Sequence, residues 1–243
     1  MAHVDLCSGL GGFALGFQWA ELSSPALFCD IEPWSRKILR KHWPDVPIAD
    51  DVKELANDPD GLVPDCDILT AGYPCQPFSI AGLQKGSLDD RHIWSHLHKI
   101  IAQKFNDLAS GKIKRLIVNM PPRHTKSEFA SYLFPAWMMG LRPNAKLMQV
   151  SHNAELSYRF GRKVRNLVNS EDFKRIFTSV SLQADSKAAG RWNTNKGGEY
   201  FAIGVGGAVT GKGADLLIID DPHSEQEGAS ADINVFNLSL IHI

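Results

Sequence analysis

Residues 3–17 read HVDLCSGLGGFALGF, which places a short apolar strand before a glycine-rich turn and a helix-like stretch after it. Three residues of the turn are glycines: Gly9, Gly11 and Gly12. A backbone without Cβ atoms can turn tightly and come close to a ligand. A packing or helix-capping role for the same glycines is the alternative.

The residues that follow continue the alternation of strands and helices. Strand-like runs occupy 25–32, 46–52 and 66–74, and a helical segment at 33–44 ends at a proline. Strands that alternate with helices predict a parallel α/β sheet, here a partial Rossmann-like one. Asp30 and Glu32 stand at the end of the second strand, where a carboxylate can accept hydrogen bonds from ribose hydroxyls. The pattern therefore indicates a nucleoside cofactor without saying which one.

Composition suggests a soluble globular protein made of two unlike parts. The 243 residues are 44% hydrophobic and 22% charged, without a bilayer-length apolar run or a secretion signal, so we expect a cytoplasmic protein and no membrane partner. Residues 1–94 carry 7 Lys and Arg against 14 Asp and Glu, whereas residues 95–243 carry 19 against 13. All four cysteines lie in the acidic part and none forms a C-x-x-C pair.

We place the boundary between the two parts between Asp90 and His98, although no Pro/Gly/Ser linker marks it. The predicted division is 1–94, 95–236 and an unassigned tail at 237–243. The second part again alternates helices and strands. Helices are expected at 95–112, 126–140 and 154–170, and strands at 114–122, at 145–152 and twice within 197–222.

The most specific motif is GYPCQPFS at 72–79. Together with DLCSGLGG at 5–12, FCDIEPW at 28–34 and ADDVKEL at 49–55, it resembles the DNA cytosine-C5 methyltransferases in order and spacing over residues 4–92. The resemblance implies double-stranded DNA as substrate and S-adenosylmethionine as methyl donor. It makes Cys75 the nucleophile that attacks C6 of a cytosine extruded from the duplex. A thiol with a pKa near ~8.5 needs surroundings that favour the thiolate.

The resemblance also assigns cofactor contacts. It implies that Asp30 binds the ribose, that Asp51 binds the adenine amino group, and that the three glycines surround the methionine part. The full set of expected cofactor-binding residues is Asp5, Gly9, Gly11, Gly12, Asp30, Ile31, Asp51 and Pro74.

Two departures from the family pattern stand out. Cys7 stands where the family commonly has a phenylalanine that packs on the adenine. No Glu-Asn-Val sequence occurs, and neither do the Q-x-R-x-R strand, a target-recognition region or the closing asparagine motif. Asn119 lies near where the glutamate of that motif would fall, but an asparagine cannot supply a proton, so we interpret its position as a coincidence.

A second chemistry is suggested by RLIVNMPPRHTKS at 115–127. A buried strand enters a tight loop that ends in Lys126 and Ser127, which could bind β/γ-phosphates and Mg²⁺ respectively. Met120 and Thr125 replace the two glycines of the usual phosphate loop, so a plain strand-to-helix turn is the alternative.

An apolar strand within ADLLIIDDP at 214–222 ends in two aspartates. Asp220 is positioned to bind Mg²⁺, and Asp221 could orient the attacking water. The alternative is an acidic cap after a core strand.

Residues 96–235 resemble the ATPase of the large terminase subunit of tailed bacteriophages, on PPRHTKSEFASYLFPAW, VSHNAELSYRFGRKVRN, ADSKAAGRWNTNKGGEY and GVGGAVTGKGADLLIIDDPHSEQ. The resemblance implies Mg-ATP as cofactor, DNA packaging as function, the phage portal or procapsid as partner, and a phage or prophage origin in a bacterial host. Arg123 could act as an arginine finger in cis or be a solvated loop residue. Arg162, Lys163 and Arg165 share a helix that could touch DNA phosphates, although a solvated face is the preferred interpretation.

Three hypotheses follow from these resemblances. The chain is a cytosine methyltransferase part that binds S-adenosylmethionine, or a terminase ATPase part with a foreign N-terminus, or an inactive chimera that joins two reading frames. The predicted fold is α/β throughout, a partial Rossmann-like methyltransferase sheet followed by a P-loop NTPase-like sheet. Because motifs of both families are absent, we expect little turnover in either reaction.

Overall fold

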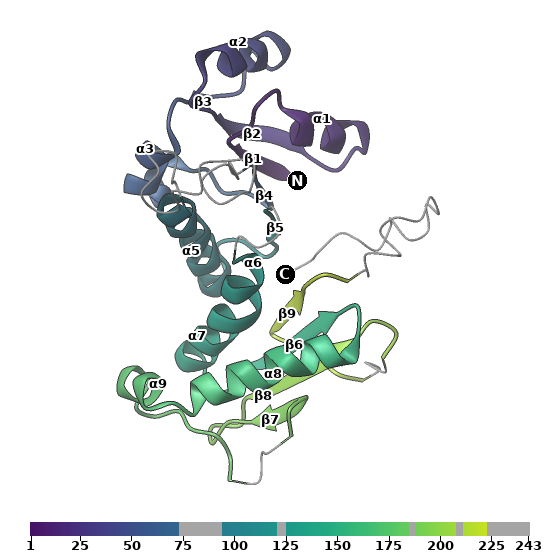
Figure 1. The fold of residues 1–243 in the computed structure, drawn as a ribbon. Coiled ribbons are helices and arrows are strands. Elements are labelled where there is room, and N and C mark those ends of the chain that lie inside the picture. Colours follow the sequence, from purple (N-terminus) through teal and green to yellow (C-terminus); the bar gives the residue numbers. More distant parts are fainter. Residues whose placement is uncertain (73–93, 121–124, 185–187, 208–210, 223–243) are drawn as a thin grey trace, which may run out of the picture. The chain divides into compact units, whose positions relative to one another are not determined.

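The computed structural model describes residues 1–72, 94–120, 125–184, 188–207 and 211–222. The chain divides into two compact units, Met1–His124 and Thr125–Ile243, and each is described by itself (Figure 1). No helix in the described part of the chain is both long enough and apolar enough to cross a bilayer.

The first unit is built on a parallel sheet with the strand order β3-β2-β1-β4-β5. Its strands are β1 (Ala2–Leu6), β2 (Ser24–Cys29), β3 (Ile48–Ala49), β4 (Ile68–Ala71) and β5 (Ile117–Asn119). Every residue of β4 is buried, as expected for a strand covered on both faces. The predicted parallel α/β sheet is thereby confirmed.

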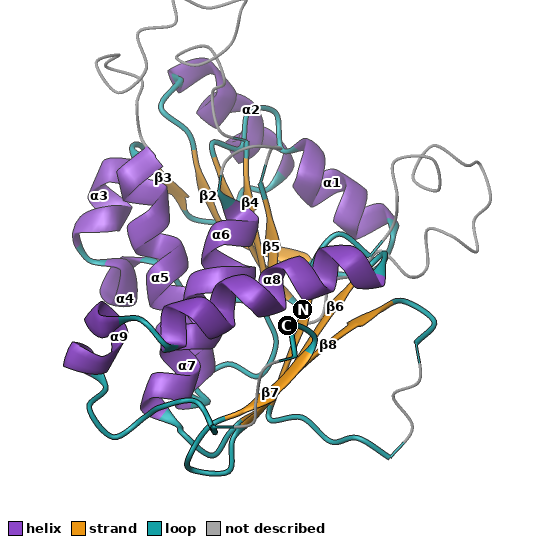
Figure 2. Cartoon of the chain, turned by 60° about the horizontal axis from the view of Figure 1, so that its bottom comes forward, coloured by secondary structure: helices purple, strands orange, loops and turns teal. Residues whose placement is uncertain are grey.

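Helices connect these strands and cover both faces of the sheet. They are α1 (Gly12–Trp19), α2 (Pro33–His42), α3 (Val52–Asn57), α4 (Pro59–Leu62) and α5 (Trp94–Ser110). Figures 1 and 2 place α1 and α5 on opposite faces. Phe28 of β2 packs with Ala14 and Leu39, and the Trp43 ring closes this cluster with its centroid 5.1 Å from that of Phe28.

The boundary between the units differs from the one expected between Asp90 and His98. The buried face of α5 packs against α3 and α4, and the Lys104 ammonium in its middle donates to the carbonyls of Val63 and Pro64. After α5, β5 pairs with β4 in parallel. Apolar burial and sheet pairing therefore attach residues 94–120 to the first unit.

The second unit contains a mixed sheet with the strand order β7-β8-β6-β9. Its strands are β6 (Lys146–Ser151), β7 (Arg191–Asn193), β8 (Glu199–Gly204) and β9 (Leu216–Ile219). β8, β6 and β9 are parallel, whereas β7 runs antiparallel to β8. The predicted P-loop arrangement is not reproduced here, because the strand that enters the phosphate loop, β5, is paired in the first unit instead.

One long helix covers this second sheet. Residues Ala154–Val168 form α8, which packs along β8 and β6 (Figure 2). A side chain at Gly161 would overlap the carbonyl oxygen of Ala189, at 2.3 Å from a Cβ built there, so glycine permits close packing. Trp192 donates from its indole nitrogen to the carbonyl of the same glycine at 3.2 Å and stacks on Tyr200.

The predicted helix at 126–140 forms in three continuous pieces. They are α6 (Lys126–Glu128), a π-helical turn η2 (Phe129–Leu133) and α7 (Phe134–Leu141). The short helix α9 (Glu171–Ile176) follows α8. Single π-helical turns inside α-helices are frequent at functional sites.

Candidate functional site

The glycine-rich turn joins β1 to α1 in the first unit. Cys7, Gly9 and Gly11 all have positive φ values, 54°, 55° and 79°. The Ser8 hydroxyl fastens the turn to β1 by donating to the Asp5 carbonyl at 2.6 Å, and the Ser8 amide donates to the Cys29 carbonyl of β2. The turn is therefore held at the carboxyl edge of the sheet.

The individual glycines of the turn have different roles. A Cβ at Gly11 would lie 2.7 Å from the Trp43 ring, so this glycine is needed for packing. Among the described residues, no atom lies within 4 Å of a Cβ built at Gly9 or Gly12. Open space beside Gly9 and Gly12 is what a ligand that approaches the backbone requires.

Asp30 connects this turn to the end of β2. Its carboxylate accepts from the Gly9 amide at 2.7 Å and from the Glu32 amide at 2.9 Å, and its side chain is largely buried. The structure thus brings together two predicted cofactor residues that lie far apart in the sequence. A carboxylate held by two backbone donors has a fixed orientation.

Asp5 lies inside the sheet rather than at its surface. The residue is fully buried on β1, and one carboxylate oxygen accepts from the Thr70 hydroxyl at 2.5 Å. Burial raises the pKa of Asp5 to about 7, although the Thr70 hydrogen bond opposes this rise. His3, whose imidazole bonds the same hydroxyl at 2.7 Å, has a pKa lowered by burial to about 4.

The remaining described residues of the set occupy the same edge or the next element. Ile31 is 65% exposed just after β2, and Asp51 caps α3 by accepting from the Lys53 amide at 2.9 Å. Trp34, at the start of α2, is 64% exposed, a large apolar surface to which the sequence reasoning gave no role. Trp34 is the last residue of the FCDIEPW motif at 28–34, and this position could have indicated a role beside the cofactor.

The segment predicted to carry the catalytic cysteine begins at the same edge. Gly72 follows β4, donates to the Leu6 carbonyl of β1 at 2.9 Å and lies so close to Cys7 that a Cβ would sit 2.7 Å from the Cys7 carbonyl oxygen. The predicted residues Pro74 and Cys75 lie outside the described residues. The loop that carries them therefore starts beside the glycine-rich turn.

In the second unit the predicted phosphate-loop and strand-end residues converge. The Lys126 ammonium lies 3.2 Å from the Asp221 carboxylate, and the Ser127 hydroxyl donates to Asp220 Oδ1 at 3.2 Å. Asp220 and Asp221 directly follow β9, and the Asp220 side chain is buried. Arg123 lies outside the described residues.

One residue of this cluster was missed by the sequence reasoning. Ser131, in η2, donates its hydroxyl to Asp220 Oδ2 at 2.8 Å. Burial raises the pKa of the Asp220 carboxyl above its ordinary value, and donation from Ser131 lowers it. A serine four residues after a candidate phosphate-loop serine was the signal, since both lie on one helix face.

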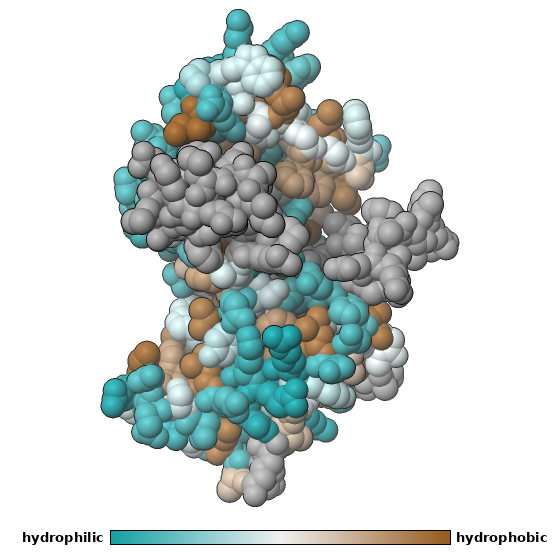
Figure 3. Space-filling model, viewed as in Figure 1, coloured by the Kyte–Doolittle hydropathy of each residue, from teal (hydrophilic) through white to brown (hydrophobic). Residues whose placement is uncertain are grey.

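The basic residues of α8 are partly engaged within the unit. Lys163 forms an ion pair with Glu128, and the Arg165 guanidinium donates to the Ala188 carbonyl at 3.3 Å. Arg162 is exposed, and Figure 3 shows hydrophilic residues over the outer side of this helix. The preferred interpretation as a solvated face therefore holds for Arg162, whereas Lys163 and Arg165 are half-buried and bonded within the unit.

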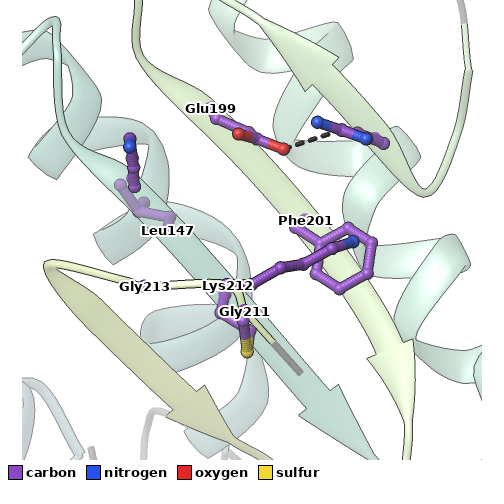
Figure 4. Close-up of a pocket in the computed structure, with 9 residues that line it drawn as sticks. Leu147, Glu199, Phe201, Gly211, Lys212 and Gly213 are labelled. Carbon is purple, nitrogen blue, oxygen red and sulfur yellow. Dashed lines mark ion pairs between the residues drawn. The ribbon is translucent and has the colours of Figure 1, made fainter. Parts of the chain in front are cut away.

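A pocket of about 200 Å³ lies beside β6 and β8 of the second unit (Figure 4). The Lys212 ammonium sits over the Phe201 ring at 3.2 Å from its centroid, and Arg191 pairs with Glu199 at 2.7 Å. The ion pair neutralises the Arg191 charge, and the Lys212 ammonium is held against an aromatic face. Among the described residues no cluster of three or more His, Cys, Asp or Glu forms a metal site.

Comparison with known proteins supports the predicted methyltransferase resemblance of the first part of the chain and supports no terminase resemblance of the second. Residues 1–107 match the family model of the C-5 cytosine-specific DNA methylase. The type II methyltransferase M2.BsuMI of Bacillus subtilis is 37% identical over 86 residues, 35% of this chain and 21% of the relative. M.NlaIV of Neisseria lactamica is 40% identical over 94 residues, 36% of this chain and 21% of the relative.

A DNA N-6-adenine-methyltransferase of Escherichia phage P1 is 34% identical over 112 residues, 45% of this chain and 15% of the relative. Among solved structures, a scyllo-inositol dehydrogenase of Lactobacillus casei aligns over 84% of this chain and 69% of its own, with 12% identity and a TM-score of 0.27, too low to support an argument. The chain spans about a fifth of the length of the first two relatives. None of these matches supports a terminase ATPase, and the similarity to the C-5 cytosine-specific DNA methylase is carried by residues 1–107.

Proposed function

We propose that the first unit binds S-adenosylmethionine and carries the thiol nucleophile of a reaction that methylates C5 of cytosine in double-stranded DNA. The observation that supports this most is the bond between the Gly9 amide and the Asp30 carboxylate at 2.7 Å, which joins the glycine-rich turn to the end of β2. Ligands of open parallel α/β sheets bind outside the carboxyl ends of the strands.

The residues at this edge fit a nucleoside cofactor. Open space beside Gly9 and Gly12 accommodates a ligand against the backbone, and Asp30 keeps acceptor capacity for ribose hydroxyls. The exposed Ile31 and Trp34 supply apolar surface for a base. When bound, S-adenosylmethionine supplies an electrophilic methyl group.

The chain's own contribution to the reaction is the thiolate of Cys75. In the proposed step its sulfur bonds to cytosine C6 and the electron pair moves to C5, which then takes the methyl group. Loss of the C5 proton and of the thiolate restores the ring. The given sequence contains no Glu-Asn-Val, so no residue is assigned here to protonate N3.

Covalent trapping tests this step directly. A duplex in which the target cytosine carries fluorine at C5 cannot lose that substituent, so the cysteine adduct should persist when the methyl donor is present. We expect a denaturant-stable complex with the full chain and none with Cys75→Ser. A complex of equal yield with Cys75→Ser would refute the assigned nucleophile.

We propose as a second function that the second unit binds Mg-ATP. The more specific proposal is that it is part of a terminase motor, with DNA and a phage portal as partners. The contacts of Lys126 with Asp221 and of Ser127 with Asp220 support it. Mg²⁺ is commonly held by one or two carboxylates together with substrate phosphates and waters, which fits this small donor set.

Equilibrium binding of ATP with Mg²⁺ tests the second function. Lys126→Ala should lose affinity by at least about tenfold, since a phosphate-binding charge is removed. Lys196→Ala, an exposed lysine of the same unit, serves as the matched control. Equal affinity of the two variants would exclude Lys126 from a phosphate site.

A further inference from the structure

Two hydroxyl groups hold the buried carboxylate at the end of β9. Ser127 donates to Asp220 Oδ1 at 3.2 Å and Ser131 donates to Asp220 Oδ2 at 2.8 Å. The two serines are four residues apart, which places them on one face of a continuous helical segment. Each oxygen of the carboxylate thus has its own serine donor.

A bound cation would affect the Ser127 and Ser131 hydroxyls differently. Ser127 lies next to Lys126, which already contacts Asp221, and a cation at this place would engage the Ser127 hydroxyl and Asp220 Oδ1. Ser131 is fully buried and touches the opposite oxygen. Its hydrogen bond can therefore persist while the cation binds.

The local helix geometry supports a specific role for Ser131. A serine inside a helix commonly bonds back to a carbonyl one turn earlier. Ser131 lies instead in a π-helical turn and bonds a carboxylate that is distant in the sequence. Substitution of one donor to a buried carboxylate leaves that oxygen without a partner.

We propose that Ser131 is a positioning residue that orients Asp220 for a divalent cation shared with Ser127. This inference rests on the Mg-ATP site proposed above for the second unit. Ser131 itself touches neither the cation nor a nucleotide.

Binding of Mn²⁺ alone, followed by electron paramagnetic resonance, tests the inference without nucleotide. For Ser131→Ala we expect the dissociation constant to rise about tenfold, the effect of losing one hydrogen bond to a charged group. Ser131→Thr keeps the hydroxyl and should restore affinity to within about threefold of the wild type.

A matched control separates positioning from a general loss of packing. Ser157 is also fully buried in this unit, but its hydroxyl donates to the Ile203 carbonyl at 2.6 Å. Ser157→Ala should lower thermal stability as much as Ser131→Ala does and leave Mn²⁺ affinity unchanged. An equal loss of affinity in both variants would overturn the positioning role.

The outcome also separates this inference from the nucleotide proposal. If the wild type binds Mn²⁺ with the expected dependence on Ser131 but binds no ATP, the inference stands and the Mg-ATP function fails. If ATP binds in a Lys126-dependent way while Ser131→Ala leaves Mn²⁺ affinity unchanged, the inference fails alone. A folded wild-type chain that binds no Mn²⁺ overturns it as well.

Discussion

At the scale of single residues, the first unit contains a buried polar chain that runs from His3 through Thr70 to Asp5. The pKa of Asp5 is raised to about 7 and that of His3 is lowered to about 4, both by burial. The folded state therefore favours the uncharged form of each. A raised carboxyl pKa contributes stability that is present below the unfolded value of 3.8 and is lost as the pH rises through about 7.

Asp5→Asn should remove this dependence. The free energy of unfolding of the wild type, relative to the variant, is expected to fall by about 2–4 kcal/mol between pH 4 and 7, at about 1.4 kcal/mol per pKa unit. His3 has the opposite sign, since its stability is lost as the pH falls from 6.5 to about 4, but it is common to both chains. Urea unfolding at several pH values measures the difference, and parallel curves would contradict it.

A second residue-scale prediction concerns the glycine-rich turn. Gly11 combines a φ of 79° with a Cβ position 2.7 Å from Trp43, so Gly11→Ala should destabilise the chain by at least about 1 kcal/mol. Gly16→Ala is the control, because Gly16 lies within α1 with open space around its Cβ position and alanine favours helices. Thermal unfolding of the two variants should shift in opposite directions.

At the scale of elements, α5 lies in the first unit, whereas its sequence was predicted to begin the second part of the chain. Its apolar positions predicted a helix correctly, but the charge change near residue 94 suggested a new domain. Lys104 illustrates the reason. A lysine in the middle of a helix predicts a solvent-exposed position, but this one is fully buried against the carbonyls of Val63 and Pro64. Such a partnership depends on residues forty positions away and leaves no local signal.

Removing this charge should unfold the first unit more readily. Lys104→Met removes the lysine donor from two carbonyls and from Asp107 Oδ2, although Asp107 Oδ1 keeps its bond from Gln103, and we expect a loss of about 3 kcal/mol or more. Lys99→Met changes an exposed lysine of the same helix and is expected to have an effect within about 0.5 kcal/mol. Comparable losses in both variants would contradict the role of the buried contacts.

Other elements could be predicted because their signals are local. The turn after β1 and the strand β2, which ends at Cys29, follow from glycine spacing and apolar runs. Lys126 and Ser127 also contact the two aspartates after β9 within one unit, and the ligand roles of these residues stay predictions. The spacing of Ser131 from Ser127 places both serines on one helix face, but the bond from Ser131 to Asp220 joins residues 89 positions apart and has no local sequence pattern. The pairing of β5 with β4 joins residues 68–70 to residues 117–119, a contact between distant residues that no local pattern predicts.

At the scale of the whole molecule, the two proposed sites belong to different units. Their ligands should therefore respond to different substitutions. Lys126→Ala is expected to weaken ATP binding and leave the dissociation constant for S-adenosylmethionine within about twofold. Equilibrium titrations with each ligand measure this, and a tenfold loss for both ligands would mean that the units do not act separately.

Titration calorimetry of S-adenosylmethionine into the full chain tests the central claim, that the first unit is a methyltransferase cofactor site. The account predicts saturable binding that weakens at least about tenfold in Asp30→Asn, where one charged acceptor is lost. Asp45→Asn, at an exposed position of the same unit, should bind as the wild type does. A folded wild type that binds no S-adenosylmethionine, or an Asp30→Asn chain that binds it undiminished, would contradict the account.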